Sequence, residues 1–227
     1  MAKEDFINVT PGRRESRFSR HELTDISISM LVLTLAFVLL YRDGGIGTYP
    51  WYLEHTYGTA AKWALLFLTC LGLVVFSFLL HELGHKFTAQ NMGMRSEYRM
   101  FPLGLVVTLV SSMIGFLFAA PGAVMIYGHP DKKENALISL AGPCVNIVLA
   151  LVGIAGLFAF NHTPWVFVFL LMANLNAFLA LFNLLPVPPL DGSKIWQWSI
   201  PLYVAAIAVA ALEVAYMWFW MPDLYWA

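Results

Sequence analysis

The most informative stretch of this chain closes a long apolar run and reads Phe78-Leu79-Leu80-His81-Glu82-Leu83-Gly84-His85-Lys86-Phe87. The run covers residues 63–87, which is longer than the roughly 20 residues that a helix needs to cross the hydrocarbon core of a bilayer. Ionisable side chains inside such a helix are costly and are rare there unless they serve a function. The stretch therefore predicts a membrane-spanning helix that carries a functional site.

The composition of the whole chain agrees with this location. Of its 227 residues, 59% are hydrophobic and 12% are charged, whereas a soluble domain usually carries roughly 25% charged residues. The mean hydropathy is +0.70. The net charge of −1 excludes a nucleic-acid-binding module, which would need a basic excess. We therefore expect a multi-pass, all-α membrane protein in contact with the lipid bilayer.

Five apolar runs are candidates for transmembrane helices, namely residues 26–41, 63–87, 136–160, 165–185 and 202–220. A sixth run, residues 102–120, is ambiguous. It contains glycine, serine and β-branched residues, and its periodicity fits either a helix or a buried β-hairpin. The sequence thus predicts five to six transmembrane helices. Residues 1–25 are expected to form a solvated cytoplasmic tail, and residues 26–227 a single membrane domain.

The charged stretch has the spacing of a zinc site. On a helix, His81 and His85 lie one turn apart on the same face and can present two imidazole nitrogens to one Zn²⁺. Glu82 stands beside them and can accept a proton from water at the metal. The alternative is a pair of buried histidines that only make hydrogen bonds, and the cost of placing three ionisable groups in a membrane helix argues against it.

A catalytic zinc usually takes a third protein ligand. Asp191 is the preferred candidate because it follows a run interrupted by Pro186, Pro188 and Pro189. Irregular backbone at membrane depth is tolerated only where it is buried in protein or lines a water-filled cavity. An ordinary turn carboxylate remains the alternative for Asp191. The other possible ligands lie in terminal segments, loops or the last span, and are His21, His55, His129, His162 and Glu213.

These motifs, in this order, resemble the site-2 protease family of intramembrane zinc metalloproteases. The resemblance covers residues 63–192, and it also rests on two stretches typical of archaeal and bacterial members, residues 118–124 and 141–146. It implies that one zinc ion per chain is bound by His81, His85 and Asp191, and that Glu82 is the general base. It also implies that the substrate is a transmembrane segment of another protein. Many members carry PDZ or CBS domains, and neither is expected in this sequence.

The resemblance constrains the topology. Asp191 can reach His81 and His85 only if residues 102–128 form a re-entrant or β-rich hairpin between the second and third full spans. With that hairpin and a cytoplasmic N-terminus, all of the 13 lysines and arginines except Arg42 and Lys62 fall on the cytoplasmic side. A full crossing would move Lys132, Lys133 and Lys194 outside. The charge distribution therefore favours re-entry, in a cell-membrane protein whose zinc site faces the cytoplasm.

Two further groups of residues have candidate roles. Residues Gly104, Val106 and Thr108 of the hairpin could offer a strand edge to an unwound substrate, or the hairpin could simply plug the cavity. Three asparagines could donate to the developing oxyanion or hold the metal ligands, or they could merely join helices; they are Asn146, Asn176 and Asn183.

The sequence as a whole predicts an intramembrane zinc metalloprotease that cuts a membrane protein within or near a transmembrane segment, as in regulated intramembrane proteolysis. The alternative is a metal transporter or metal-sensing membrane protein with the same ligands and no hydrolysis. Glu82 favours the protease, because a transport site needs no base beside its first histidine. The absence of an internal repeat also argues against a transporter.

Overall fold

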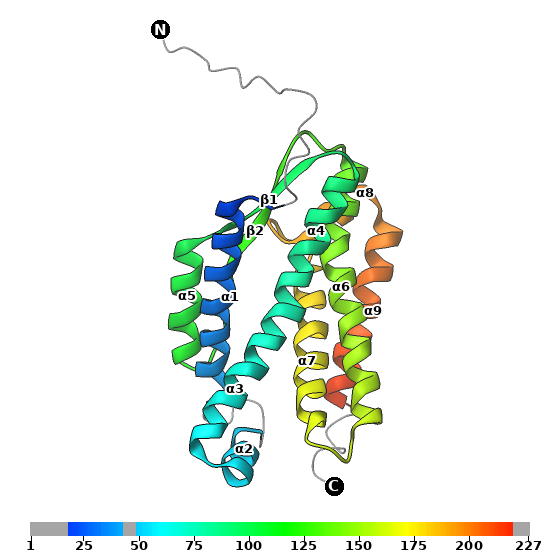
Figure 1. Cartoon of the computed structure of the whole chain (residues 1–227). Coiled ribbons are helices and arrows are strands. Elements are labelled where there is room, and N and C mark those ends of the chain that lie inside the picture. Colours follow the sequence, from blue (N-terminus) through cyan, green and yellow to red (C-terminus); the bar gives the residue numbers. More distant parts are fainter. Residues whose placement is uncertain (1–17, 43–48, 220–227) are drawn as a thin grey trace.

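The structure, a computed structural model, describes residues 18–42 and 49–219. It is a bundle of long helices with a two-stranded sheet at one end (Figure 1). In chain order the elements are α1 (Arg20–Tyr41), α2 (Tyr49–Tyr57), α3 (Thr59–Val74), the π-helical segment η1 (Val75–Leu79), α4 (Leu80–Asn91), β1 (Arg95–Met100), α5 (Pro102–Met113), β2 (Gly122–Tyr127), α6 (Lys132–Ala159), α7 (Trp165–Asn183), α8 (Asp191–Trp198) and α9 (Ile200–Phe219).

Within the described residues, five helical segments are long and apolar enough to cross a membrane. They are α1, the continuous segment Thr59–Asn91 formed by α3, η1 and α4, and the helices α6, α7 and α9. They coincide with the five predicted ranges apart from their ends. The predicted end at Trp220 and most of the predicted tail, residues 1–17, lie outside the described residues.

The first long helix begins before the predicted range 26–41. Helix α1 begins at Arg20, so the last part of the expected tail is helical. Ser19 explains the early start, because its hydroxyl accepts a hydrogen bond from the backbone N–H of Glu22 and so caps the helix.

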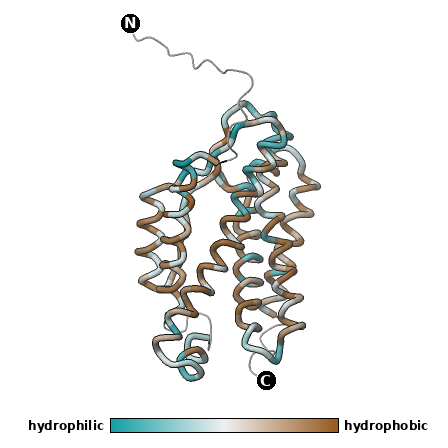
Figure 2. Tube along the Cα trace, viewed as in Figure 1, coloured by the Kyte–Doolittle hydropathy of each residue, from teal (hydrophilic) through white to brown (hydrophobic). Residues whose placement is uncertain are grey.

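The outer surface of the bundle is apolar along the helices. Figure 2 shows hydrophobic residues along the lengths of the long helices and hydrophilic residues gathered toward the two ends. Large apolar side chains point outward on several of these helices, for example Leu68 at 60% exposure and Leu212 at 69%. Such a surface would be unfavourable in water and suits contact with lipid.

The sheet joins two strands that are separated in sequence by α5. Strands β1 and β2 are antiparallel, with Tyr98 opposite Val124 and Met100 opposite Gly122. The ladder continues to Phe101, whose N–H donates to the carbonyl of Pro121 at 2.9 Å. The chain therefore leaves the sheet, forms α5, and returns to the point from which it left, at one end of the bundle (Figure 1).

The predicted strand edge at Gly104, Val106 and Thr108 is wrong, because all three residues lie in helix α5. The β-branched residues of this run suggested a strand. In an apolar environment, however, a helix is favoured because its backbone N–H and C=O groups are hydrogen-bonded within the same segment. Thr108 even bonds its hydroxyl to the carbonyl of Gly104 one turn earlier. The extended part of the expected hairpin is β2, and its partner β1 precedes the expected hairpin altogether.

Helix α5 packs against α1 and against its own returning segment. Gly104 permits this, since a Cβ at that position would collide with the carbonyl oxygen of Ala120. On the other side of the bundle, α6 packs against α4, α7 and α8. This packing brings the charged stretch of α4 to the beginning of α8, where Asp191 lies.

Candidate metal centre

Three buried side chains from two distant parts of the chain meet at one point. His81 and His85 come from α4 and Asp191 from the first residue of α8. The Nε2 atoms of the two histidines are 3.0 Å apart. Asp191 Oδ2 lies 3.2 Å from Nε2 of His85 and 3.6 Å from Nε2 of His81. In the part of the chain that the structure describes, no other group of histidine, cysteine or acidic residues converges in this way.

The spacing of these atoms fits a zinc ion. Donor atoms that bind a tetrahedral zinc at about 2.0–2.1 Å lie about 3.3 Å from one another, and the observed separations bracket this value. Two imidazole nitrogens and one carboxylate oxygen are ligands that zinc accepts, and three protein ligands are typical of a catalytic zinc. The donor set and its geometry therefore suit the ion that the sequence predicts.

Space for an ion is left by a glycine on α6. A Cβ added at Gly142 would lie 2.6 Å from Nε2 of His81 and closer still to Nε2 of His85. Any other residue at this position would therefore place a carbon atom against the two nitrogens. Gly142 keeps open the side of the site that faces α6.

Both histidines are oriented through their other ring nitrogen. Nδ1 of His81 is hydrogen-bonded to Oδ1 of Asn146 at 2.5 Å, and Nδ1 of His85 to the backbone carbonyl of Ile138 at 2.7 Å. Both partners are acceptors, so each Nδ1 carries the proton and each Nε2 offers its lone pair to an ion.

Asn146 is itself held by a network of buried amides. Its amide nitrogen donates to the carbonyl of Ser77 at 3.0 Å and to Oδ1 of Asn176 at 2.8 Å. Asn176 in turn donates to the hydroxyl of Ser77 and to the carbonyl of Met172. Both amide hydrogens of Asn146 are thus engaged, which leaves none for an oxyanion. Of the roles left open for these residues, the geometry favours holding the metal ligands.

The third asparagine is not part of this network. The amide of Asn183 bonds to the carbonyl of Leu179 in its own helix. The other candidate ligands, His21, His55, His129, His162 and Glu213, also lie outside the cluster of His81, His85 and Asp191.

Asp191 is presented by the break between α7 and α8. The backbone approaches itself closely here, because a Cβ at Gly192 would collide with the carbonyl of Leu184. The Asp191 carboxylate points its Oδ2 atom at Nε2 of both histidines, so the three donor atoms face one common point.

Glu82 is held by the sheet. Its Oε2 accepts a hydrogen bond from the backbone N–H of Val124 in β2 at 3.1 Å. One carboxylate oxygen is thereby fixed, and Oε1 is the oxygen left for a proton. Neither Val124 nor the Ile138 carbonyl could be found by sequence reasoning, since backbone groups carry no residue signal. Gly142 and Asn146 both lie in the stretch 141–146 that supported the resemblance.

Comparison with known proteins supports the same assignment. The sequence model described as peptidase family M50 matches residues 67–165 and 159–216. The chain belongs to peptidase family M50. This family is that of the site-2 proteases, so the resemblance is confirmed, and with it the prediction of a zinc metalloprotease. Family membership and the five apolar helices together identify a multi-pass integral membrane protein.

Relatives of this M50 peptidase come from archaea and bacteria. A protein of Methanocaldococcus jannaschii named "Putative zinc metalloprotease" is 34% identical over 90% of this chain and 98% of its own length. A protein of Bacillus subtilis with the same description is 31% identical over 59% of this chain and 69% of its own. A second M. jannaschii protein, named "Zinc metalloprotease", is 30% identical over 59% of this chain and 33% of its own. No solved structure matches the chain.

Replacing Gly142 by alanine should abolish zinc binding by this M50 peptidase, because the added methyl group would occupy the space between the two Nε2 atoms. Gly153→Ala is the matched control on the same helix, since its Cβ would meet Ala173 of α7 and not the site. Zinc content per purified chain measures the effect. Full zinc occupancy in the Gly142→Ala protein would contradict this account of the site.

Replacing Asn146 by leucine should weaken zinc binding by about 10- to 100-fold, the usual cost of removing a partner that orients a ligand histidine. Asn183→Leu is the control, because that amide bonds only within its own helix among the described residues. Competition against a metal-binding dye would measure both affinities. Equal affinities in the two variants would show that Asn146 does not orient His81.

Proposed function

We propose that this protein is an intramembrane protease that hydrolyses a peptide bond within or near a transmembrane segment of another membrane protein, in regulated intramembrane proteolysis. The observation that carries the proposal is the meeting of His81, His85 and Asp191 beside Glu82. This arrangement combines a three-ligand metal site with an adjacent carboxylate base inside a bundle of membrane-length helices.

In the proposed reaction His81, His85 and Asp191 would hold the zinc ion, and Glu82 is the general base. Zinc held there would lower the pKa of water and polarise the scissile carbonyl. Glu82 takes a proton from the attacking water and returns it to the nitrogen of the leaving amine, so the carboxylate is restored in each cycle. The Val124 N–H holds Oε2 of Glu82, which directs the other oxygen toward the proton.

The depth of the site supports a substrate that lies in the membrane. Helix α4 ends at Asn91, six residues after His85 or about 9 Å along the helix, and His81 is a further turn inside. A helical substrate has its carbonyls bonded internally, so it must unwind locally before water can attack. In the described structure, β2 is the extended backbone that touches Glu82.

We further propose that α5 is re-entrant and that the zinc site and N-terminus face the cytoplasm. A helix of 12 residues is about 18 Å long, too short for the roughly 30 Å hydrocarbon core. Strand β1 precedes α5 and strand β2 follows it, and the two strands are paired, so the chain enters and leaves this segment at the same end of the bundle. The distribution of lysine and arginine favours the cytoplasm for this end.

The rival function, a metal transporter or sensor, explains the ligands but not Glu82. A transport site has no need of a carboxylate that is held by a backbone N–H beside the first histidine. Membership of a peptidase family also favours hydrolysis.

Replacing Glu82 by glutamine should leave zinc bound and lower the cleavage rate by about 10²- to 10⁴-fold, the usual contribution of a general base. His81→Ala and Asp191→Ala should lose zinc and activity together. Cleavage of a membrane-anchored test substrate in detergent or vesicles, with and without a zinc chelator, measures activity, and Glu54→Gln at the other end of the bundle is the control. Full activity of Glu82→Gln would refute the proposed role.

Single cysteines can test the re-entrant course of α5. In a background with Cys70→Ser and Cys144→Ser, we expect Asn91→Cys and His129→Cys to react with a membrane-impermeant maleimide from the cytoplasmic side. His162→Cys, in the turn between α6 and α7, should react from the opposite side. Labelling of positions 91 and 129 from opposite sides would show that α5 crosses the membrane.

A further inference from the structure

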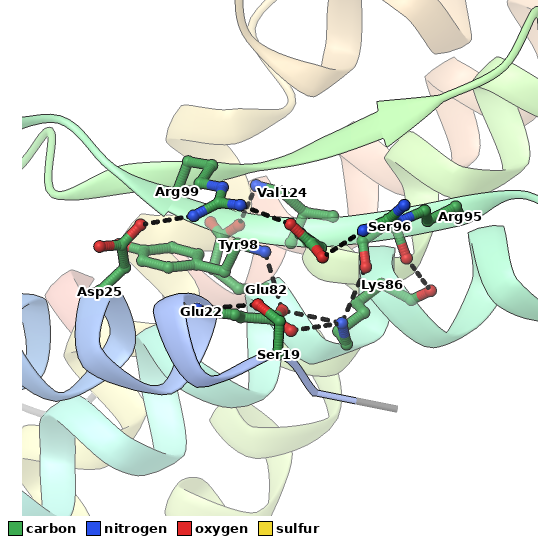
Figure 3. Close-up of polar contacts among 11 residues, drawn as sticks. Ser19, Glu22, Asp25, Glu82, Lys86, Arg95, Ser96, Tyr98, Arg99 and Val124 are labelled. Carbon is green, nitrogen blue, oxygen red and sulfur yellow. Dashed lines mark hydrogen bonds and ion pairs between the residues drawn. The ribbon is translucent and has the colours of Figure 1, made fainter. Parts of the chain in front are cut away.

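A buried ion pair lies close to the proposed active site but is not part of it. Lys86 follows His85 directly, and Glu22 lies in the first turn of α1; their exposed fractions are 1% and 0%. The Lys86 ammonium donates to Oε1 of Glu22 at 2.8 Å and to Oε2 at 2.9 Å. The ring of Phe18 covers the ammonium at 4.7 Å. This pair joins the beginning of α1 to the helix that carries the metal ligands (Figure 3).

The same two side chains also hold strand β1. Glu22 Oε1 accepts the backbone N–H of Tyr98 at 2.8 Å, and the Lys86 ammonium donates to the backbone carbonyl of Ser96 at 2.8 Å. The hydroxyl of Ser96 donates to the carbonyl of Lys86 at 3.1 Å. All three hydrogens of the ammonium are therefore used, two on the carboxylate and one on the strand (Figure 3).

The strand held in this way leads back to Glu82. Tyr98 is opposite Val124 in the sheet, and the N–H of Val124 donates to Glu82 Oε2. Glu82 and Lys86 are one turn apart on α4. The contacts thus form a closed ring that runs from Glu82 along α4 to Lys86, through Glu22 and Tyr98 to Val124, and back to Glu82.

We propose that Glu22 and Lys86 are positioning residues for the reaction, which hold the sheet so that the Val124 N–H fixes the carboxylate of Glu82. The proposal rests on the proposed role of Glu82 as general base. The polar partners of the two side chains are each other and the backbone of β1, not the donor atoms of His81, His85 or Asp191. Their action passes through β1 and β2.

A purely stabilising role would be a weak reason to bury this pair. Removing two charges from water is costly, and replacing a buried ion pair by apolar residues of similar size is often neutral or stabilising. The two charges cannot be exchanged without losing contacts to β1. The Glu22 carboxylate accepts the N–H of Tyr98, and the Lys86 ammonium donates to the carbonyl of Ser96, so the pair has a fixed polarity relative to the strand. An ion pair that only joined α1 to α4 would not need that polarity.

The double variant Glu22→Leu/Lys86→Met separates the two roles. It removes both charges together and keeps apolar volume, so we expect zinc content and melting temperature close to those of the unchanged protein. The kcat for the test substrate should fall by about 10- to 100-fold, as misplacement of a catalytic group can cause, with KM changed much less. The control is Glu54→Leu/Lys62→Met, which removes the ion pair at the other end of the bundle and should leave kcat unchanged.

Two more variants test the polarity of the contacts. The single variants Glu22→Leu and Glu22→Gln both remove the carboxylate, but Glu22→Gln retains an acceptor for the Tyr98 N–H and should therefore keep a higher kcat than Glu22→Leu. The exchange Glu22→Lys/Lys86→Glu restores opposite charges but sets the ammonium against the Tyr98 N–H and the carboxylate against the Ser96 carbonyl. It should therefore not restore kcat. Full recovery by the exchange would show that only the attraction between α1 and α4 matters, and would overturn the proposal.

Hydrogen exchange of the sheet provides a readout that needs no activity. In the double variant Glu22→Leu/Lys86→Met, backbone amides of β1 and β2 should exchange faster while those of α6 and α7 are unchanged. Unchanged exchange together with unchanged kcat would refute the proposal. If the unchanged, zinc-loaded protein cleaved no substrate, the proposed protease function would fail, and the exchange result alone would still decide whether the pair holds the sheet.

Discussion

Three polar groups, the imidazoles of His81 and His85 and the carboxylate of Asp191, point at one another inside an apolar bundle. The neighbouring helices hold them in this arrangement. The two Nε2 atoms and the Asp191 carboxylate approach to between 3.0 and 3.6 Å. An imidazole ring can rotate about its side-chain bonds, so the rings of His81 and His85 each need a hydrogen bond at Nδ1 to fix their orientation. Asn146 and the carbonyl of Ile138 supply these bonds from α6. Helix α6 is thus both a packing element and the support of the site.

The same requirement explains the irregular backbone. Free carbonyls are expensive in a dry interior, yet α3 and α4 are joined by a π-helical segment and α7 ends in a proline-rich break. Each irregularity has buried partners. The Ser77 carbonyl in the π-helical segment accepts the amide of Asn146, and the break after α7 is closed by tight contact between Gly192 and Leu184. The departures from regular helix therefore occur where they orient or position a residue of the candidate metal centre.

The parts that could be predicted from sequence were those with a strong local signal. His81, Glu82 and His85 follow from helical spacing in an apolar run, and the five long helices follow from their length. Asp191 was suggested by the prolines before it. Strand β1 was not predicted, because every second residue is charged (Arg95, Glu97 and Arg99) and the segment is short, while α5 carries the β-branched residues expected of a strand. Long-range hydrogen bonds to backbone groups, such as Val124 to Glu82, leave no trace in a sequence.

The π-helical segment has a consequence for the helix that contains it. A π turn holds one residue more than an α turn, and one residue corresponds to about 100° of rotation around an α-helix. The side chains of α4 are therefore turned by about that angle from the positions that an uninterrupted α-helix would give them. Leu66, Cys70 and Leu73 of α3 are buried in the apolar core with α1, while His81 and His85 of α4 turn toward α6. In an uninterrupted α-helix His81 would lie about 60° around the axis from Leu66, and His85 about 100°. The π turn brings both back toward the side of Leu66, so one side of the segment stays buried along its whole length, apolar in α3 and carrying His81 and His85 in α4, without a bend supplied by proline.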